Sequence, residues 1–177
     1  MMKIETERLI LRDQLAEDWE DVHEYSSIAE FSQYDSWGPN TREDTQSFVQ
    51  TNLQQAQSDE RFQYDLAVVH KKDHKVIGGI GIRRASELSF VSDLGFAINP
   101  RYQSQGLASE AVRAILNFVF DELKLALVYA TCDIKNTASF RVMEKCGMLR
   151  VGKITKHKEF KGAWHDSYRY EIVNKKI

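Results

Sequence analysis

The segment Gln103-Ser104-Gln105-Gly106-Leu107-Ala108 has the residue types and spacing of an anion-binding loop. It lies between an apolar run that stops at Asn99-Pro100 and a helical pattern of apolar residues that begins near Leu107. Gly106 lets the backbone approach a ligand closely, and Ala108 leaves room beside it. The first turn of a helix carries unpaired N–H donors and partial positive charge, so the segment predicts a site for an anion such as a pyrophosphate.

A second glycine-rich segment, Gly78-Gly79-Ile80-Gly81, begins like a dinucleotide-binding fingerprint. However, Arg84 stands where the third glycine belongs, and the segment falls inside a predicted hairpin rather than before a helix. We therefore interpret these glycines as positions of close backbone packing or bulges in a strand. The sequence contains no Walker A pattern, which excludes phosphoryl transfer on a P-loop.

Metal chemistry has little support in the sequence. The five histidines form no HExxH motif. Cys132 and Cys146 form no CxxC pair, and we expect both to be small buried side chains in a reducing compartment. No metal site is predicted.

Several segments carry a resemblance to a known family. Gln103-x-x-Gly106-x-Ala108 resembles the acyl-CoA loop, Gln/Arg-x-x-Gly-x-Gly/Ala, of the GNAT superfamily of N-acetyltransferases. The segment 93–96 resembles the strand that precedes this loop, and the segment 136–148 is similar to the second motif of the family. The segment 7–12 and Asp18 resemble the opening of the RimJ/RimL branch, which acetylates protein N-terminal amines.

The resemblance implies acetyl-CoA as a co-substrate and no metal. Asn136 would cap a helix and contact the pantetheine arm, Ser139 would donate a hydrogen bond to the departing thiolate, and a backbone N–H of the strand 96–98 would meet the thioester oxygen. Met143 occupies the position of a tyrosine general acid in many members, and methionine has no proton to donate. The implied cofactor contacts are Phe96, Ala97, Ile98, Gln103, Ser104, Gln105, Gly106, Leu107, Ala108, Ser109, Asn136 and Ser139.

Asp93 is the main candidate for handling the proton of the acceptor amine. It matches an acidic residue common in the branch, and its carboxylate could take a proton from an ammonium group, directly or through water. The alternative is a structural acceptor between strands. Asp133 on the following strand is a second candidate with a weaker claim.

The acceptor site is the least defined part of the sequence, because residues 30–60 match the family poorly. Tyr34 and Trp37 fall on a loop between two predicted helices, where the resemblance implies the acceptor side of the cleft. Trp164-His165-Asp166 resembles a Trp-x-Asp element of the branch, so Asp166 is a further candidate contact. Alternatively, Tyr34 and Trp37 pack the helix connection and Asp166 caps a hairpin. We expect a peptide amine or a small-molecule amine as substrate.

The hydrophobic pattern predicts an α+β fold in a single domain, 1–177. We expect the GNAT fold, with a central, mixed and mostly antiparallel seven-stranded sheet flanked by about four helices. The predicted strands are 4–12, 62–70, 75–83, 87–98, 126–134, 149–160 and 164–173, and the predicted helices are 16–32, 41–57, one that begins near 107, and 136–145.

Composition places the chain among globular proteins. Its 177 residues are 42% hydrophobic and carry a net charge of −2, so a nucleic-acid partner is not expected. We find neither an apolar run long enough for a membrane span nor a signal peptide, and the expected location is the cytoplasm. The expected state is a monomer or a homodimer. The rival to an acetyltransferase is a non-catalytic acyl-CoA sensor with the same fold.

Overall fold

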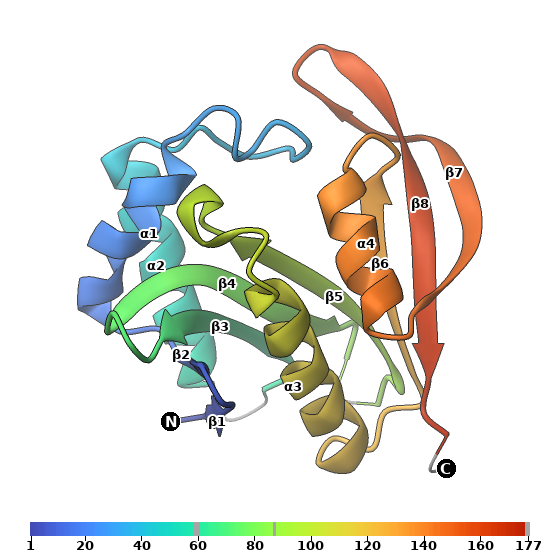
Figure 1. The fold of residues 1–177 in the computed structure, drawn as a ribbon, viewed down its shortest axis with the longest axis horizontal. Coiled ribbons are helices and arrows are strands. Elements are labelled where there is room, and N and C mark those ends of the chain that lie inside the picture. The colour runs from blue at the N-terminus through green and yellow to red at the C-terminus, as the bar shows by residue number, and fades with distance from the viewer. Residues whose placement is uncertain (59–60, 87, 176–177) are drawn as a thin grey trace.

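A computed structural model of the protein describes residues 1–58, 61–86 and 88–175. These residues form one eight-stranded sheet in the order β1-β2-β3-β4-β5-β6-β8-β7 (Figure 1). The strands are β1 (Lys3–Glu5), β2 (Leu9–Asp13), β3 (Gln63–His70), β4 (Lys75–Arg84), β5 (Val91–Ile98), β6 (Leu127–Asp133), β7 (Leu149–Phe160) and β8 (Ala163–Val173). The helices are α1 (Trp19–Ser26), α2 (Arg42–Ala56), α3 (Leu107–Asp121) and α4 (Thr137–Lys145), with short 3-10 turns at Ala16–Asp18 and Pro100–Tyr102.

The predicted α+β class and the mixed, mostly antiparallel sheet with four helices are confirmed, but the predicted number of seven strands is wrong. The segment expected to be one strand, 4–12, is the hairpin β1–β2, with Lys3 opposite Arg12. Polar and apolar residues alternate through both strands, and the turn contains neither Gly nor Pro. The sequence pattern therefore does not predict a turn here. The Glu110 carboxylate on α3 holds the turn by accepting hydrogen bonds from Thr6 Oγ1 (2.6 Å) and Arg8 N (2.9 Å).

Two helix predictions had different outcomes. The first predicted helix, 16–32, is shorter than expected, because α1 ends at Ser26 and the chain continues without regular structure to residue 41. The second predicted helix, 41–57, is confirmed as α2, and a capping box opens it. Thr41 Oγ1 accepts from Asp44 N (3.1 Å), and the Asp44 carboxylate accepts from Thr41 N (3.0 Å). The predicted start of the strand before the loop, Glu87, lies outside the described residues.

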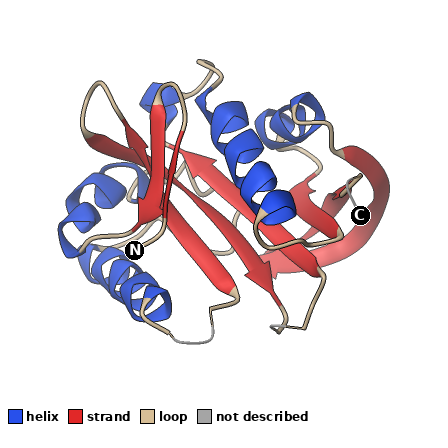
Figure 2. Ribbon diagram, turned by 90° about the horizontal axis from the view of Figure 1, so that it is seen from below, coloured by secondary structure: helices blue, strands red, loops and turns tan. Residues whose placement is uncertain are grey.

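Two pairs of helices cover the two faces of the sheet (Figures 1 and 2). Along β3, Leu66 belongs to a core cluster shared with α3 and α4, whereas the next residue, Ala67, packs in a second cluster with Val22 of α1 and Val49 of α2. Neighbouring strand residues point to opposite faces, so one strand supplies both clusters.

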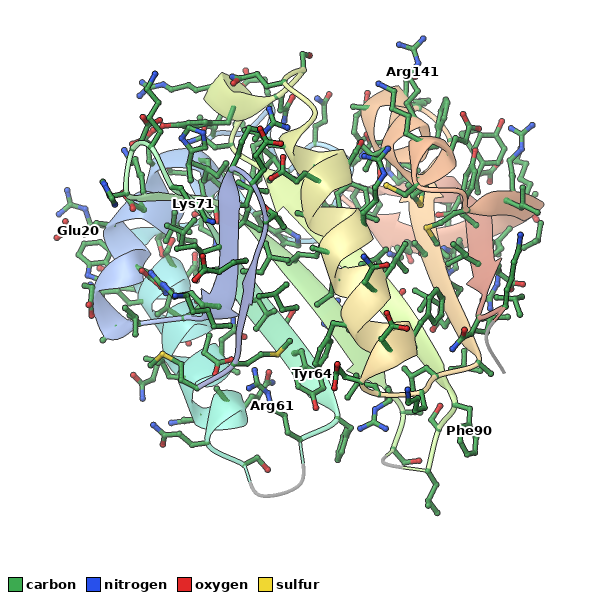
Figure 3. All side chains as sticks on the ribbon, turned by 60° about the horizontal axis from the view of Figure 1, so that its bottom comes forward. Glu20, Arg61, Tyr64, Lys71, Phe90 and Arg141 are labelled. Atoms are coloured by element: carbon green, nitrogen blue, oxygen red, sulfur yellow. The ribbon has the colours of Figure 1, made fainter. Side chains whose placement is uncertain are left out.

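Strands β5 and β6 are the only parallel neighbours among the described strands, and they pair over a short distance. Residues 91–93 of β5 face residues 127–129 of β6, and the two strands separate beyond this point (Figure 1). The closed end is completed by Phe90, whose carbonyl accepts from Ala126 N at 2.9 Å. Figure 3 shows Phe90 at the opposite end of the molecule from Arg141 on α4. A gap between two strands of one sheet therefore opens toward the start of α4.

Candidate functional site

A cleft of about 1250 Å³ occupies this gap and extends over the sheet toward the loop between α1 and α2. Most of the residues that the sequence singled out lie along it. They are Tyr34, Trp37, Asp93, Phe96, Ala97, Ile98, Gln103, Ser104, Gly106, Leu107, Ala108, Ser109, Asn136 and Ser139. Gln105 and Asp166 are not among the lining residues.

The start of α3 presents unpaired donors to the cleft. Gly106 is its N-cap, with φ of 80°, and no side chain caps the helix. Because Glu110 N is the first donor to bond back into the turn, to Gly106 O at 3.0 Å, the N–H groups of residues 107–109 precede the helical ladder. Gln103 Nε2 donates to Ile98 O (2.9 Å) and fixes the preceding loop against β5. This geometry suits an anion.

Arg8 holds the outer side of this loop. Its guanidinium donates to Gln105 O (2.9 Å) and pairs with the Glu110 carboxylate (2.7 Å). These contacts account for the position of Gln105 outside the cleft, while Gly106 lies inside it.

The open edge of β5 offers a backbone donor. Asn99 N bonds to Ile77 O on β4 (2.7 Å), and backbone groups alternate in direction along a strand, so those of Phe96 and Ile98 face β6. Ile98 O already accepts a hydrogen bond from Gln103 Nε2. The N–H of Phe96 is directed into the gap, where β6 has already diverged.

The first turn of α4 positions Ser139. Asn136 is the N-cap of this helix, as expected, and its Oδ1 accepts from Ser139 N at 3.1 Å. The hydroxyl of Ser139 contacts the thiol of Cys132 on β6. Burial raises the pKa of Cys132 to about 11, so this thiol stays protonated at neutral pH and is a poor nucleophile. Met143 is fully buried.

Asp93 lies half-buried in a row of charged groups on the other face of the sheet. Arg83 Nη1 is 3.7 Å from Asp93 Oδ2, and the same guanidinium pairs with Asp65. Burial raises the pKa of the Asp93 carboxyl, and Arg83 opposes this shift. Gly81 leaves space for the row, because a Cβ there would come within 2.3 Å of Asp65 Oδ1.

The interpretation of the β4 glycines as sites of close packing is confirmed for Gly78 and Gly81, but not for Gly79, where a Cβ would lie 3.7 Å from Leu66 O. A Cβ on Gly78 would lie 2.2 Å from Ala97 O on the neighbouring strand. No side chain fits there without movement of the backbone.

Sequence reasoning missed an aspartate–histidine pair in the cleft. His165 Nδ1 lies 2.7 Å from Asp133 Oδ2, and the His165 ring stacks on Phe160 with centroids 3.8 Å apart and an interplanar angle of 13°. All three residues line the cleft. From the sequence, Asp133 was treated without a partner. His165 lies 32 residues later, on β8, and no sequence motif connects the two residues.

The loop between α1 and α2 supplies aromatic side chains to the acceptor side. Trp37 is 40% exposed and contacts Phe31 edge-on, at 5.7 Å between ring centroids. Burial raises the pKa of the Asp35 carboxyl, and Lys158 and Lys161 oppose this shift. Lys161 Nζ donates to Ser32 O (2.5 Å), which connects the β7–β8 turn to this loop.

Asp166 binds residues of the β7–β8 hairpin. Its carboxylate pairs with Lys153 Nζ (2.6 Å) and accepts from Lys156 N (2.9 Å). The geometry therefore gives no support to the expected contact with the amine and agrees with the alternative, a capped hairpin. Both oxygens of the Asp166 carboxylate already have partners on β7, Lys153 and Lys156.

Within residues 1–58, 61–86 and 88–175, no group of three or more His, Cys, Asp and Glu side chains is arranged to hold a metal ion. In the same part of the chain, none of the helices is long and apolar enough to cross a membrane.

Comparison with known proteins places this geometry in context. The acetyltransferase (GNAT) domain family matches residues 8–149. The chain is 36% identical over 173 residues to the uncharacterized N-acetyltransferase YnaD of Bacillus subtilis strain 168, covering 97% of both proteins. It is similar to the crystal structure of a GNAT-family acetyltransferase from Bacillus anthracis, with a TM-score of 0.88 and 36% identity over 98% of this chain and 99% of that one.

A more distant structure shares the fold. RimL, a ribosomal L7/L12 alpha-N-protein acetyltransferase, has a TM-score of 0.85 and 17% identity, with 97% of this chain and 94% of that chain covered. At this level of identity the likeness concerns the fold.

Proposed function

The chain belongs to the acetyltransferase (GNAT) family, whose members use acetyl-CoA, and from this premise we propose that it transfers an acetyl group to a primary amine by direct attack. The acceptor is a protein N-terminal α-amine or a small-molecule amine. The observation that carries the proposal is that the uncapped start of α3 and the open edge of β5 face one cleft.

The residues present fit acetyl-CoA, which supplies the acetyl group as an activated thioester. The unpaired N–H groups at residues 107–109 suit its pyrophosphate, and Gly106 keeps a side chain away from that position. Asn136, which caps α4 and lines the cleft, would contact the pantetheine arm. The N–H of Phe96 is the donor for the thioester oxygen as negative charge develops.

Ser139 is proposed as the donor to the leaving group. As the new C–N bond forms and the C–S bond breaks, its hydroxyl gives a hydrogen bond to the thiolate sulfur. Met143, at the alternative position on the same helix, is buried and has no proton to give. The cleft needs no covalent enzyme intermediate, and Cys132, with its raised pKa, is not suited to form one.

Asp93 is proposed as the carboxylate that attracts the protonated amine. Its side chain lines the cleft on the face opposite Ser139. A model α-amine has a pKa near 8 and a lysine amine near 10.4, so deprotonation at neutral pH is easier for the α-amine by roughly 3 kcal/mol. This difference favours an N-terminal amine or another amine of low pKa.

The test is CoA-thiol release from acetyl-CoA with a panel of alanyl and seryl peptides, polyamines and aminoglycosides, with mass spectrometry of the products. We expect at least one amine to accelerate thiol release and to gain one acetyl group, while its N-acetylated form does not react. If the protein binds acetyl-CoA but no amine accelerates release of the CoA thiol, the result would instead support a non-catalytic acyl-CoA sensor.

Replacement of Trp37 by alanine should raise the KM of the amine about 2- to 30-fold, the range that corresponds to a cation–π contact of 0.5–2 kcal/mol. The KM of acetyl-CoA should stay nearly constant, because Trp37 lies on the α1–α2 side of the cleft. Steady-state kinetics with each substrate varied in turn measures both values. Phe90→Ala, which removes an exposed aromatic outside the cleft, is the control. A selective effect of Trp37→Ala on acetyl-CoA would place the acceptor elsewhere.

A further inference from the structure

The pair formed by Asp133 and His165 has the construction of a base with a fixed orientation. Asp133 is only 6% exposed, and its Oδ2 lies 2.7 Å from His165 Nδ1. Its other oxygen accepts from Lys135 N at 2.7 Å. The flat face of the imidazole is held against Phe160. The ring is thus fixed both by a hydrogen bond and by stacking.

This contact determines which ring nitrogen carries the proton. An ionised carboxylate can only accept a hydrogen bond, so Nδ1 is the N–H donor and Nε2 keeps its lone pair in the neutral ring. None of the described residues makes a hydrogen bond with Nε2, and His165 lines the cleft. The lone pair of Nε2 is therefore available to a ligand.

The sheet register places the pair on the acceptor side. Asp93 pairs with Tyr129, so Asp93 and Asp133 share one face of the sheet, since residues an even number apart on β6 point the same way. Cys132, next to Asp133, points to the opposite face and contacts Ser139. A proton acceptor and a thiolate donor thus stand on opposite faces of the β5–β6 gap.

The charges around His165 come from several elements of the fold. Lys158 on β7 lies opposite His165 in the strand register and interacts electrostatically with Asp93 as well as with Asp35. Lys161 in the β7–β8 turn also acts on Asp35. Other charged groups on this face include Arg83 and Asp65, which form the row with Asp93. Arg169 on β8 also acts on Asp93, lies over the Tyr129 ring and pairs with Glu171. The strand register and the shared cleft lining place the pair and Asp93 on the same side of the cleft.

We propose that His165 is the general base of the acetyl transfer, with Asp133 as its positioning residue; this inference rests on the function proposed above. Nε2 takes one proton from the bound ammonium group and so frees the nitrogen lone pair, which attacks the thioester carbon. The C–N bond forms as the C–S bond breaks, and the second proton leaves the nitrogen for solvent. The thiolate leaves toward Ser139, the Asp133 carboxylate stabilises the imidazolium, and His165 then returns its proton to solvent.

Asp93 was the main sequence candidate for handling the amine proton, with Asp133 as the second; here Asp93 and the Asp133–His165 pair have separate roles. Asp93 attracts the ammonium group; burial raises the pKa of its carboxyl, and the Arg83 guanidinium beside it opposes this shift. Asp93 is already paired with Arg83, whereas Nε2 of His165 has no hydrogen-bond partner among the described residues.

The experiment measures kcat/KM for the best peptide amine of the panel between pH 6 and 9.5, in wild type, His165→Gln and Asp133→Asn, with acetyl-CoA affinity by calorimetry. At pH 7 we expect His165→Gln to lower kcat/KM by about 100-fold or more, within the range of general-base catalysis. Acetyl-CoA affinity should stay within about twofold, because His165 belongs to the acceptor side. Between pH 7 and 9 the deficit should shrink by about tenfold, as an α-amine with a pKa near 8 deprotonates in solution.

Asp133→Asn keeps the shape of the side chain but removes the charge that fixes the Nδ1–H tautomer. We expect a loss of kcat/KM and a change in the His165 tautomer seen in ¹⁵N imidazole shifts. His157→Gln is the matched control, since His157 on the same hairpin bonds to Ser167 (2.9 Å) and does not line the cleft. It should retain nearly the wild-type rate and pH profile.

Three results would overturn the assignment. A His165→Gln enzyme with the wild-type rate and profile would exclude His165 as the base and leave the proposed function intact. An equal loss at every pH, together with weaker acetyl-CoA binding, would show a structural role. A wild-type protein that binds acetyl-CoA but acetylates no amine would remove the proposed function and the base with it.

Discussion

A Gly106→Val variant is expected to bind acetyl-CoA at least about tenfold more weakly than the wild type. Gly106 is the N-cap of α3, and a branched side chain there would project beside the unpaired N–H groups that suit a pyrophosphate. The backbone φ of 80° also opposes valine, so the donors themselves would shift. Calorimetric titration with acetyl-CoA measures the loss.

A Gly162→Val variant separates the effect of the valine side chain at the binding loop from the effect of backbone strain. Gly162 has φ of 76° in the β7–β8 turn, and a Cβ there would meet no atom within 4 Å. Its replacement imposes a similar backbone strain away from the cleft, so acetyl-CoA affinity should be unchanged. Circular dichroism confirms that both variants are folded. If folded Gly106→Val binds with undiminished affinity, this loop does not hold the pyrophosphate.

Features that depend on neighbours in the sequence could be predicted. The uncapped start of α3 was visible because a strand, a turn and a helix follow one another within a few residues around Gly106. The cap at Asn136 was visible for the same reason, since its side chain bonds to a residue in the first turn of its own helix. Local spacing carries this information because the interacting groups are close in the chain.

The Asp133–His165 pair could not be predicted in this way. It depends on the antiparallel register of β6 and β8, in which Asp133 faces Ser167 and His165 lies two residues further along. The sequence resemblance drew attention to Asp166 instead. Successive residues of a strand point to opposite faces, so a difference of one position separates a cleft residue from one that pairs with Lys153.

Replacement of Ser139 by alanine should lower kcat about 10- to 100-fold and leave the KM of acetyl-CoA nearly unchanged. A hydrogen bond to a charged group contributes roughly 1.5–3 kcal/mol, and the sulfur acquires its charge only as the C–S bond breaks. The loss therefore falls on the chemical step. The N-cap bond of α4 survives, because it uses the backbone N–H of residue 139 and the side chain of Asn136.

Thr137→Ala is the matched control for this measurement. Thr137 carries a hydroxyl in the same helical turn but is not among the residues that line the cleft. Its replacement should leave both kcat and KM near the wild-type values. A loss in Ser139→Ala confined to the KM of acetyl-CoA would make Ser139 a binding residue. An unchanged kcat would mean that the thiolate departs with water as its donor, because Met143 has no proton to offer and the Cys132 thiol is a weak donor held by burial in its protonated form.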